Sequence, residues 1–255
     1  MNRVGIIQGR LTHPREGFQD CPSEWEKEFN LLPGLGLSHI EWIVTKEKYD
    51  SNPIHSENLK HFNISSVCAD FLVHDNFLTD ETYWNKLEEI CLLAFKNEIP
   101  YVTLPLLEGS SVVDSNKRSR LIYKLKDLVN KFPFLKFSIE AELGSQELLE
   151  IVNPLENVYI TYDTGNMTSF GSDHYEYLND VLHKVNNVHL KDRDHEAVSY
   201  IPGQGKTPFK SIFKHLKESR YNGPYTIQTA REEPGQEIET ITNHLNYFME
   251  TYNAS

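Results

Sequence analysis

Four polar side chains near the ends of short apolar segments have the types that bind a divalent metal ion. Glu140 ends KFSIE, Asp163 ends VYITYD, His189 lies in VNNVHLKD and Gln228 ends YTIQ. Two carboxylates, one imidazole and one amide oxygen suit an ion such as Mn²⁺, Co²⁺, Mg²⁺ or Zn²⁺. Because no thiolate belongs to the set, a structural zinc site is disfavoured. The residue types therefore predict one divalent metal ion bound by these four side chains.

The four ligand segments are the last of eight short strands, each followed by a predicted helix. Strands are expected at 3–7, 39–44, 64–71, 101–104, 136–139, 158–162, 185–192 and 225–228, and helices at 23–36, 56–62, 79–97, 115–131, 145–152, 175–184, 208–217 and 237–251. Alternating strands and helices imply a parallel sheet, and eight such units imply a closed barrel. We therefore predict an α/β protein with a single (β/α)8 TIM-barrel domain over residues 1–255. The alternative is an open doubly wound sheet, but no G-x-G-x-x-G follows its first strand.

The strands alternate between an apolar and a polar face. Ile40 and Trp42 share one face of the second strand, whereas His39 and Glu41 share the other. The same parity recurs on later strands, as in Ser138 and Glu140 on the fifth strand. We expect the apolar faces to contact the helices and the polar faces to line the barrel. Such a barrel places its active site at the carboxyl ends of the strands.

Composition limits the classes of partner. The chain has 255 residues and a formal charge of -12, which disfavours a nucleic-acid partner because phosphate backbones call for basic patches. No run approaches the ~18 apolar residues of a membrane span, and the amino-terminal apolar run is too short for a signal peptide. Cys21, Cys68 and Cys91 are widely spaced, which indicates reduced thiols. The expectation is a cytoplasmic protein with a small-molecule partner, no nucleic acid and no membrane.

Several motifs together resemble one superfamily. KFSIEAE, YITYDTGN, NVHLKD and PGQGKTPF occur in this order, and GIIQGRL and HIEW precede them. In this order and spacing the chain resembles the xylose isomerase-like TIM-barrel superfamily, and its sugar-phosphate isomerase/epimerase group in particular. That superfamily includes sugar isomerases, epimerases and inosose dehydratases. The resemblance implies a carbohydrate substrate, and a homodimer is one open arrangement.

The resemblance also implies roles for the metal ligands. It implies that Glu140, Asp163 and His189 bind one metal ion, with a fourth ligand, usually glutamate, where this chain has Gln228. In epimerases of this group two glutamates exchange a proton beside a carbonyl, and the metal stabilises the resulting enediolate. An amide binds metal through its oxygen but is not a base. Glu140 therefore remains as one catalytic base.

Other polar residues complete the candidate site. Lys191 shares the strand face of His189 and is the first candidate for a second acid or base, with a purely electrostatic role left open. Predicted substrate contacts are Gln8, Arg10, Glu41, His74, Asn166 and Arg231, of which the two arginines suit a phosphate or carboxylate. Gly203-Gln204-Gly205 is a simple turn or a phosphate-binding loop. Structural alternatives are that Asp163 caps the turn over 163–166, that His189 is a core histidine, and that the arginines form surface ion pairs.

Three functions follow from these residues. The leading hypothesis is a metal-dependent isomerase or epimerase of a small sugar or sugar phosphate that acts through an enediolate. A metal-dependent dehydratase of the inosose dehydratase kind tolerates Gln228 better, because it needs one base and an acid for the departing hydroxyl. A non-catalytic sugar-binding barrel that has lost its second glutamate is the third. The related endonucleases, with richer histidine clusters for several zinc ions, match less well.

Overall fold

Eight parallel strands close into a barrel in the computed structural model, which describes residues 1, 3–13 and 21–255. Around the barrel the strand order is β1-β10-β7-β6-β5-β4-β3-β2, so the strands follow the chain with the last beside the first. The barrel strands are β1 (Val4–Ile7), β2 (Ile40–Ile43), β3 (Ile64–Cys68), β4 (Tyr101–Leu106), β5 (Lys136–Ala141), β6 (Val158–Asp163), β7 (Val185–Leu190) and β10 (Tyr225–Ile227). The predicted TIM barrel is confirmed.

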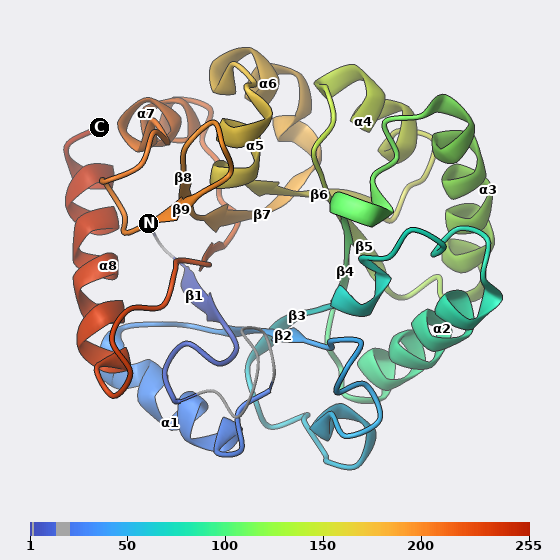
Figure 1. Ribbon diagram of the computed structural model, residues 1–255, viewed down its shortest axis with the longest axis horizontal. Helices are drawn as coiled ribbons and strands as arrows, with labels where there is room; N and C mark the ends of the chain where they lie inside the picture. Colours follow the sequence, from blue (N-terminus) through green and yellow to red (C-terminus); the bar gives the residue numbers. More distant parts are fainter. Residues whose placement is uncertain (2, 14–20) are drawn as a thin grey trace.

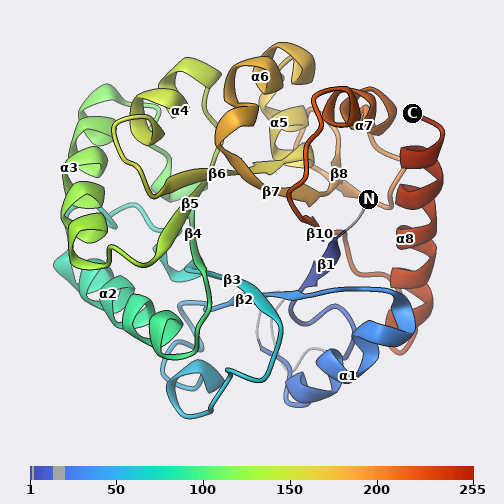
Figure 2. The same ribbon diagram turned by 180° about the vertical axis from the view of Figure 1, so that it is seen from behind.

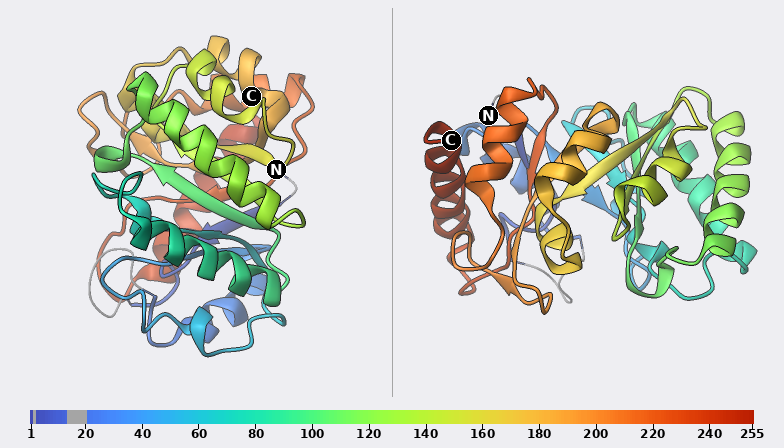
Figure 3. Two further views of the ribbon diagram at one scale, coloured as in Figure 1. Left: turned by 90° about the vertical axis from the view of Figure 1, so that its right-hand side faces the viewer. Right: turned by 90° about the horizontal axis from the view of Figure 1, so that it is seen from above.

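Helices surround the barrel on all sides (Figures 1 and 2). They are α1 (Trp25–Leu35), α2 (Glu81–Lys96), α3 (Ser115–Lys131), α4 (Ser145–Val152), α5 (Thr164–Phe170), α6 (His174–Val181), α7 (Phe209–Glu218) and α8 (Glu237–Asn253). Short 3-10 turns are η1 (Pro53–His55), η2 (Asp70–Leu72), η3 (Glu108–Ser110) and η4 (Leu182–Lys184), and β8 (Asp192–Arg193) pairs antiparallel with β9 (Ser199–Tyr200). The side views show the helices as an outer layer along the slanted strands (Figure 3).

The strand parity separates the main core from the barrel interior. Outward side chains such as Trp42 and Phe137 are fully buried in the apolar layer beneath the helices. Inward side chains such as Thr103, Ser138 and Thr161 are also buried, although they are polar. Buried polar groups need partners, and Ser138 Oγ lies 2.6 Å from Thr161 Oγ1. The interior is therefore a hydrogen-bonded polar layer below the strand ends.

Three local expectations differ from the structure. The predicted helix at 56–62 is wrong: a 3-10 turn begins at Pro53, and the Asn58 side chain accepts from the backbone N–H of Lys60, which competes with helical pairing. The helix predicted at 79–97 begins at Glu81, and Asp80 caps it. The final predicted strand residues Lys191 and Asp192 lie beyond β7, which ends at Leu190.

Two expectations, on the cysteines and on membrane-spanning segments, can be compared with the structure. Cys21, Cys68 and Cys91 are free thiols, as predicted. Within residues 1, 3–13 and 21–255, no helix has both the length and the apolar character that crossing a bilayer requires.

Candidate metal centre

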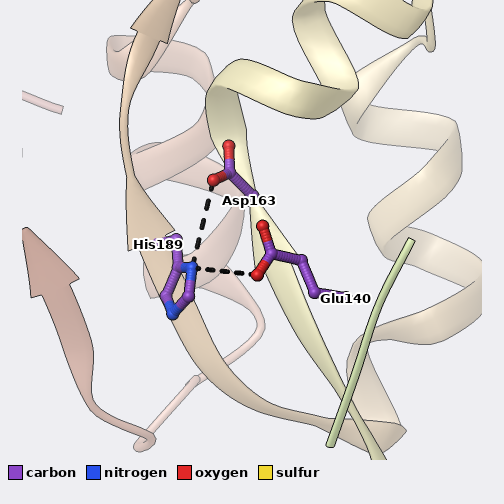
Figure 4. A group of neighbouring side chains, drawn as sticks. All are labelled: Glu140, Asp163 and His189. Atoms are coloured by element: carbon purple, nitrogen blue, oxygen red, sulfur yellow. Dashed lines mark ion pairs between the residues drawn. The ribbon is translucent and has the colours of Figure 1, made fainter. Parts of the chain in front are cut away.

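Glu140, Asp163 and His189 converge from three neighbouring strands. Glu140 lies on β5, Asp163 ends β6 and His189 lies on β7, so parallel strands bring their carboxyl ends to one edge. One ligand atom from each lies within 4.8 Å of the others. His189 Nδ1 is 3.6 Å from Glu140 Oε2 and 3.9 Å from Asp163 Oδ2 (Figure 4). The geometry therefore matches three of the four predicted metal ligands.

Glu41 fixes which nitrogen of His189 faces the two carboxylates. His189 Nε2 lies 2.6 Å from Glu41 Oε2, and both side chains are buried. Because an ionised carboxylate only accepts, Nε2 carries the proton of this hydrogen bond. In the neutral ring Nδ1 then carries no proton, and its lone pair is available to a metal ion. A carboxylate behind a ligating histidine is the usual support in metal sites.

Asn166 organises the other two ligands. Its Nδ2 donates to Glu140 Oε1 at 2.8 Å, and its backbone N–H donates to Asp163 Oδ1 at 2.7 Å. Each carboxylate thus uses one oxygen on Asn166 and directs the other toward His189. Asp163 caps helix α5, so the structural alternative for this residue holds alongside its place in the triad. The contacts place Asn166, a predicted substrate contact, in support of the ligands.

Unsatisfied buried atoms at this edge test the fit of a cation. Asp163 Oδ2, His189 Nδ1 and Gln228 Oε1 are buried and have no hydrogen-bond partner within the described part of the chain. Leaving such groups unpaired costs about 1–3 kcal/mol each. Gln228 follows β10, and its backbone N–H donates to Leu190 of β7. Two acceptor oxygens and an imidazole nitrogen are the donor set that a divalent ion would satisfy, so the residues fit a metal.

Burial and mutual charge shift the titration of the triad. Burial raises the pKa of Glu140 to about 7, and nearby Asp163 adds to this while His189 opposes it. Burial alone would lower the pKa of His189, but the Glu41 and Glu140 carboxylates outweigh it and raise that pKa to about 9. Burial likewise favours the neutral acid of Glu41, yet the adjacent His189 lowers its pKa. The metal-free site therefore holds a proton on the histidine ring.

Lys191 follows β7, lies beside the triad and contacts the first turn of α5. Its backbone N–H donates to Thr164 Oγ1 at 3.0 Å, and that hydroxyl donates back to the Lys191 carbonyl at 2.8 Å. Its stem packs over Gly165, where an added Cβ would lie 2.9 Å from Lys191 Cγ. Burial lowers the pKa of the Lys191 ammonium, and Asp163 opposes that change. The Lys191 amine therefore lies near the carboxylates and loses its proton more readily than an exposed lysine does.

The Gln8 amide bonds the backbone of β2, and the substrate contact predicted for this residue stays a prediction. Its Nε2 donates to the Ile43 carbonyl at 3.0 Å, and its Oε1 accepts from the Ile43 N–H at 3.1 Å. Both ends of the amide therefore extend the pairing between β1 and β2. Glu41 is likewise fully buried behind His189 rather than at an open surface. His74 stacks on Tyr83 with ring centroids 5.0 Å apart, away from the triad's hydrogen bonds.

The two predicted anion-binding arginines lie close together. Arg10 and Arg231 line a cavity with His13 and Glu237 near the start of α8. Burial and the adjacent Arg231 together lower the pKa of Arg10 to about 9, although Glu28 opposes the change. Arg10 Nε also donates to the Thr229 carbonyl at 3.2 Å. A role in binding an anionic substrate group stays a prediction.

The loop over Gly203 to Thr207 binds an internal carboxylate. Asp192 accepts hydrogen bonds from the backbone N–H groups of Gly203, Gly205 and Thr207 at 2.8, 3.0 and 3.1 Å. An added Cβ on Gly205 would lie 2.2 Å from Asp192 Oδ1, so the close approach needs glycine. The amides that a phosphate would need are therefore already used, which favours the structural interpretation of this loop.

Replacing Asp192 with alanine is expected to destabilise the protein by on the order of 3 kcal/mol, because three backbone donors lose their buried acceptor. Urea unfolding measures this free energy. The matched control is Asp114→Ala, which removes the exposed cap of α3 and should cost only about 1 kcal/mol. An Asp192→Ala variant no less stable than Asp114→Ala would contradict the assignment.

Known proteins share this fold, and a family model matches the part of the chain that contains the site. Residues 136–248, which contain the triad, match the family model described as xylose isomerase-like TIM barrel. The match to this family model is confined to the carboxyl-terminal part of the chain, and the likeness over the whole chain is one of fold. Both findings agree with the superfamily expected from the motifs.

The curated relatives include inosose dehydratases, which match over part of their length. The enzyme of Clostridium botulinum (strain Alaska E43 / Type E3) is 32% identical over 108 residues, which is 35% of this chain and 34% of the relative. That of Geobacillus thermodenitrificans (strain NG80-2) is 30% identical over 120 residues, 40% of this chain and 38% of the relative. The match thus spans little more than a third of either relative.

Solved structures match nearly the whole chain at low identity. An L-ribulose 3-epimerase has a TM-score of 0.78 at 14% identity and covers 100% of this chain and 95% of its own. The IolI protein with a bound zinc atom has a TM-score of 0.75 at 15% identity, with 99% and 98% coverage. The 3-keto-D-glucoside 4-epimerase YcjR from E. coli has a TM-score of 0.70 at 15% identity, with 98% and 100% coverage. At these identities the likeness shows the fold.

Proposed function

We propose that the protein is a divalent-metal-dependent isomerase or epimerase of a small sugar or sugar phosphate. The observation that carries the proposal is the triad itself: Glu140, Asp163 and His189 direct one ligand atom each toward a common point. Glu41 holds the His189 ring so that Nδ1 faces that point. The zinc-bound IolI structure and the sugar epimerases of the same fold support this choice.

A divalent ion in this site supplies Lewis-acid polarisation of a substrate carbonyl oxygen. Glu140, Asp163 and His189 would hold it, with Gln228 Oε1 as the fourth donor from the chain. Glu140 removes a proton from the carbon beside the carbonyl, and the C–H electron pair moves to form an enediolate. A carboxylate is a suitable general base for this transfer. Returning the proton to the neighbouring carbon isomerises the sugar, and returning it to the other face epimerises it.

The second acid is Lys191. Gln228 has no proton to exchange, because an amide is neither acid nor base in this range. The Lys191 ammonium lies near Asp163 and Glu140, and burial lowers its pKa, so it gives up a proton more readily than an exposed lysine. Its ammonium group is the proton donor that we propose for this step. The backbone clamp on Thr164 fixes the position from which it acts.

Dehydration is the second candidate, and the Gln228 amide favours it. Loss of water needs one base to remove the proton and one acid to protonate the departing hydroxyl, which Glu140 and Lys191 supply without a second carboxylate. Partial matches to inosose dehydratases, 30–32% identical over 108 to 120 residues, support this candidate. The first half-reaction is the same in both candidates.

Proton NMR in D2O separates the two candidates. The protein loaded with Mn²⁺, Co²⁺ or Mg²⁺ is incubated with a panel of ketopentoses, ketohexoses, their phosphates and inososes, with small-molecule spectra recorded after metal removal. Deuterium at a carbon beside the carbonyl with all hydroxyls retained indicates isomerase or epimerase chemistry. A conjugated carbonyl product that has lost water indicates the dehydratase. Tight ligand binding with no exchange in any substrate would contradict both and favour a sugar-binding barrel.

A further inference from the structure

A chain of hydrogen bonds crosses the barrel interior to His189. His39 Nε2 lies 3.3 Å from Thr226 Oγ1, which donates to Asn187 Oδ1 at 3.0 Å. Asn187 Nδ2 donates to Glu41 Oε2 at 3.2 Å, and the same oxygen accepts from His189 Nε2 at 2.6 Å. The residues come from β7, β10, β2 and the position just before β2. All five side chains are at least nine-tenths buried.

From His39 to Glu41, each side chain in this series donates its hydrogen bond to the next. The Thr226 hydroxyl has a single proton, which it donates to Asn187, so it accepts from His39 Nε2–H. Asn187 then directs its amide oxygen to Thr226 and its NH2 group to Glu41, so the oxygen and nitrogen of the amide cannot swap places. Glu41 Oε2 accepts two hydrogen bonds, one from Asn187 Nδ2 and one from His189 Nε2. An acceptor with two such donors is held as the carboxylate.

The neighbouring strand leaves room for the start of the chain. Gly5 of β1 faces the His39 ring, and an added Cβ would lie 2.3 Å from it. The His39 imidazole is neutral at neutral pH because burial lowers its pKa to about 4. A neutral ring has one N–H, and Thr226 accepts it. The close packing of Gly5 against His39 therefore fixes the position of the ring from which this series of hydrogen bonds begins.

We propose that Asn187 and Thr226 are positioning residues of the metal centre, which act through Glu41 to hold His189 with Nε2 protonated and Nδ1 open to the metal. The proposal rests on the metal-binding part of the proposed function. Neither residue touches the ligand face of the triad. Losing the Asn187 donor leaves Glu41 Oε2 with His189 alone and frees Glu41 to rotate, so the imidazole loses its fixed orientation.

The test compares three interior variants by metal affinity. Asn187→Leu removes the donor to Glu41, and Thr226→Val removes the hydroxyl that orients Asn187 with little change of shape. Ser138→Ala is the matched control, because Ser138 is equally buried but bonds Thr161 and Asn186 instead. Isothermal titration with Co²⁺ and Mn²⁺ should show about 10–100-fold weaker binding for Asn187→Leu, a smaller loss for Thr226→Val and less than about twofold change for Ser138→Ala.

A spectroscopic readout distinguishes positioning from general loss of stability. With ¹⁵N-histidine and bound Zn²⁺, the wild type should show His189 with a protonated Nε2 and a metal-bound Nδ1, and Asn187→Leu should show a mixture of ring states. Equal affinity of Asn187→Leu, Thr226→Val and Ser138→Ala would overturn the positioning role. If Asn187→Leu does not fold, Thr226→Val alone decides by the same comparison. A wild type that binds none of these ions would instead overturn the metal centre of the proposed function.

Discussion

Replacing Glu140 with glutamine is expected to lower turnover of the identified substrate by a factor of about 10²–10⁴, the usual contribution of a general base. The amide keeps the size of the side chain and an oxygen for the metal, but it cannot take the proton beside the carbonyl. The native carboxylate accepts a proton, whereas the glutamine amide does not. Steady-state kinetics, with metal at saturation, measure the loss.

The control for this experiment is Glu150→Gln on the helix that follows β5. Glu150 is exposed and pairs with Arg118 at 3.1 Å, so its loss should leave turnover and metal affinity nearly unchanged. Glu140→Gln must also be measured for metal content, because Oε2 belongs to the ligand set. Wild-type turnover in a metal-loaded Glu140→Gln variant would contradict the assigned base.

The fold could be predicted because its signals are local and repeated. Side chains alternate along each strand, so Trp42 and Phe137 on one parity and Thr103 and Ser138 on the other indicate which face meets the helices. The helix at 56–62 failed because Pro53 starts a shorter 3-10 turn, and the chain between β2 and β3 buries its apolar residues without a regular helix. Short segments provide too little periodicity to separate these outcomes.

The ligand atoms of the site were more predictable than their supports. Glu140, Asp163 and His189 could be chosen from their residue types at strand ends, and the barrel brings them together. The hydrogen bond from His189 to Glu41 joins residues 148 positions apart, and side-chain pairing at that separation has no sequence signature. The polar parity of β7 marked Asn187 as inward, but only the closed barrel shows which carboxylate it meets. The partner of Gln8 likewise has no sequence signature, since it is a backbone on another strand.

Protons held by the metal-free triad connect metal binding to pH. The pKa of His189 is raised to about 9 because the Glu41 and Glu140 charges outweigh burial, and the pKa of Glu140 is raised to about 7 chiefly by burial. The folded metal-free protein thus binds protons more tightly than the unfolded chain at both groups. Their contribution to stability is present at low pH and is lost as pH rises, for His189 between about 6.5 and 9. A metal ion takes the place of these protons.

Metal affinity is therefore expected to increase steeply with pH, by up to about tenfold per pH unit for each proton displaced. Below pH 7 a bound ion displaces protons from both His189 and Glu140, whereas between 7 and 9 it displaces one, from His189. Titration calorimetry with Mn²⁺ in two buffers of different ionisation enthalpy counts these protons directly. In Glu41→Gln the dependence between pH 7 and 9 should flatten, because a neutral amide no longer stabilises the imidazolium. An affinity that is constant from pH 6 to 9 in the wild type would mean that His189 Nδ1 is not a ligand, since a protonated imidazole nitrogen has no lone pair for a metal ion.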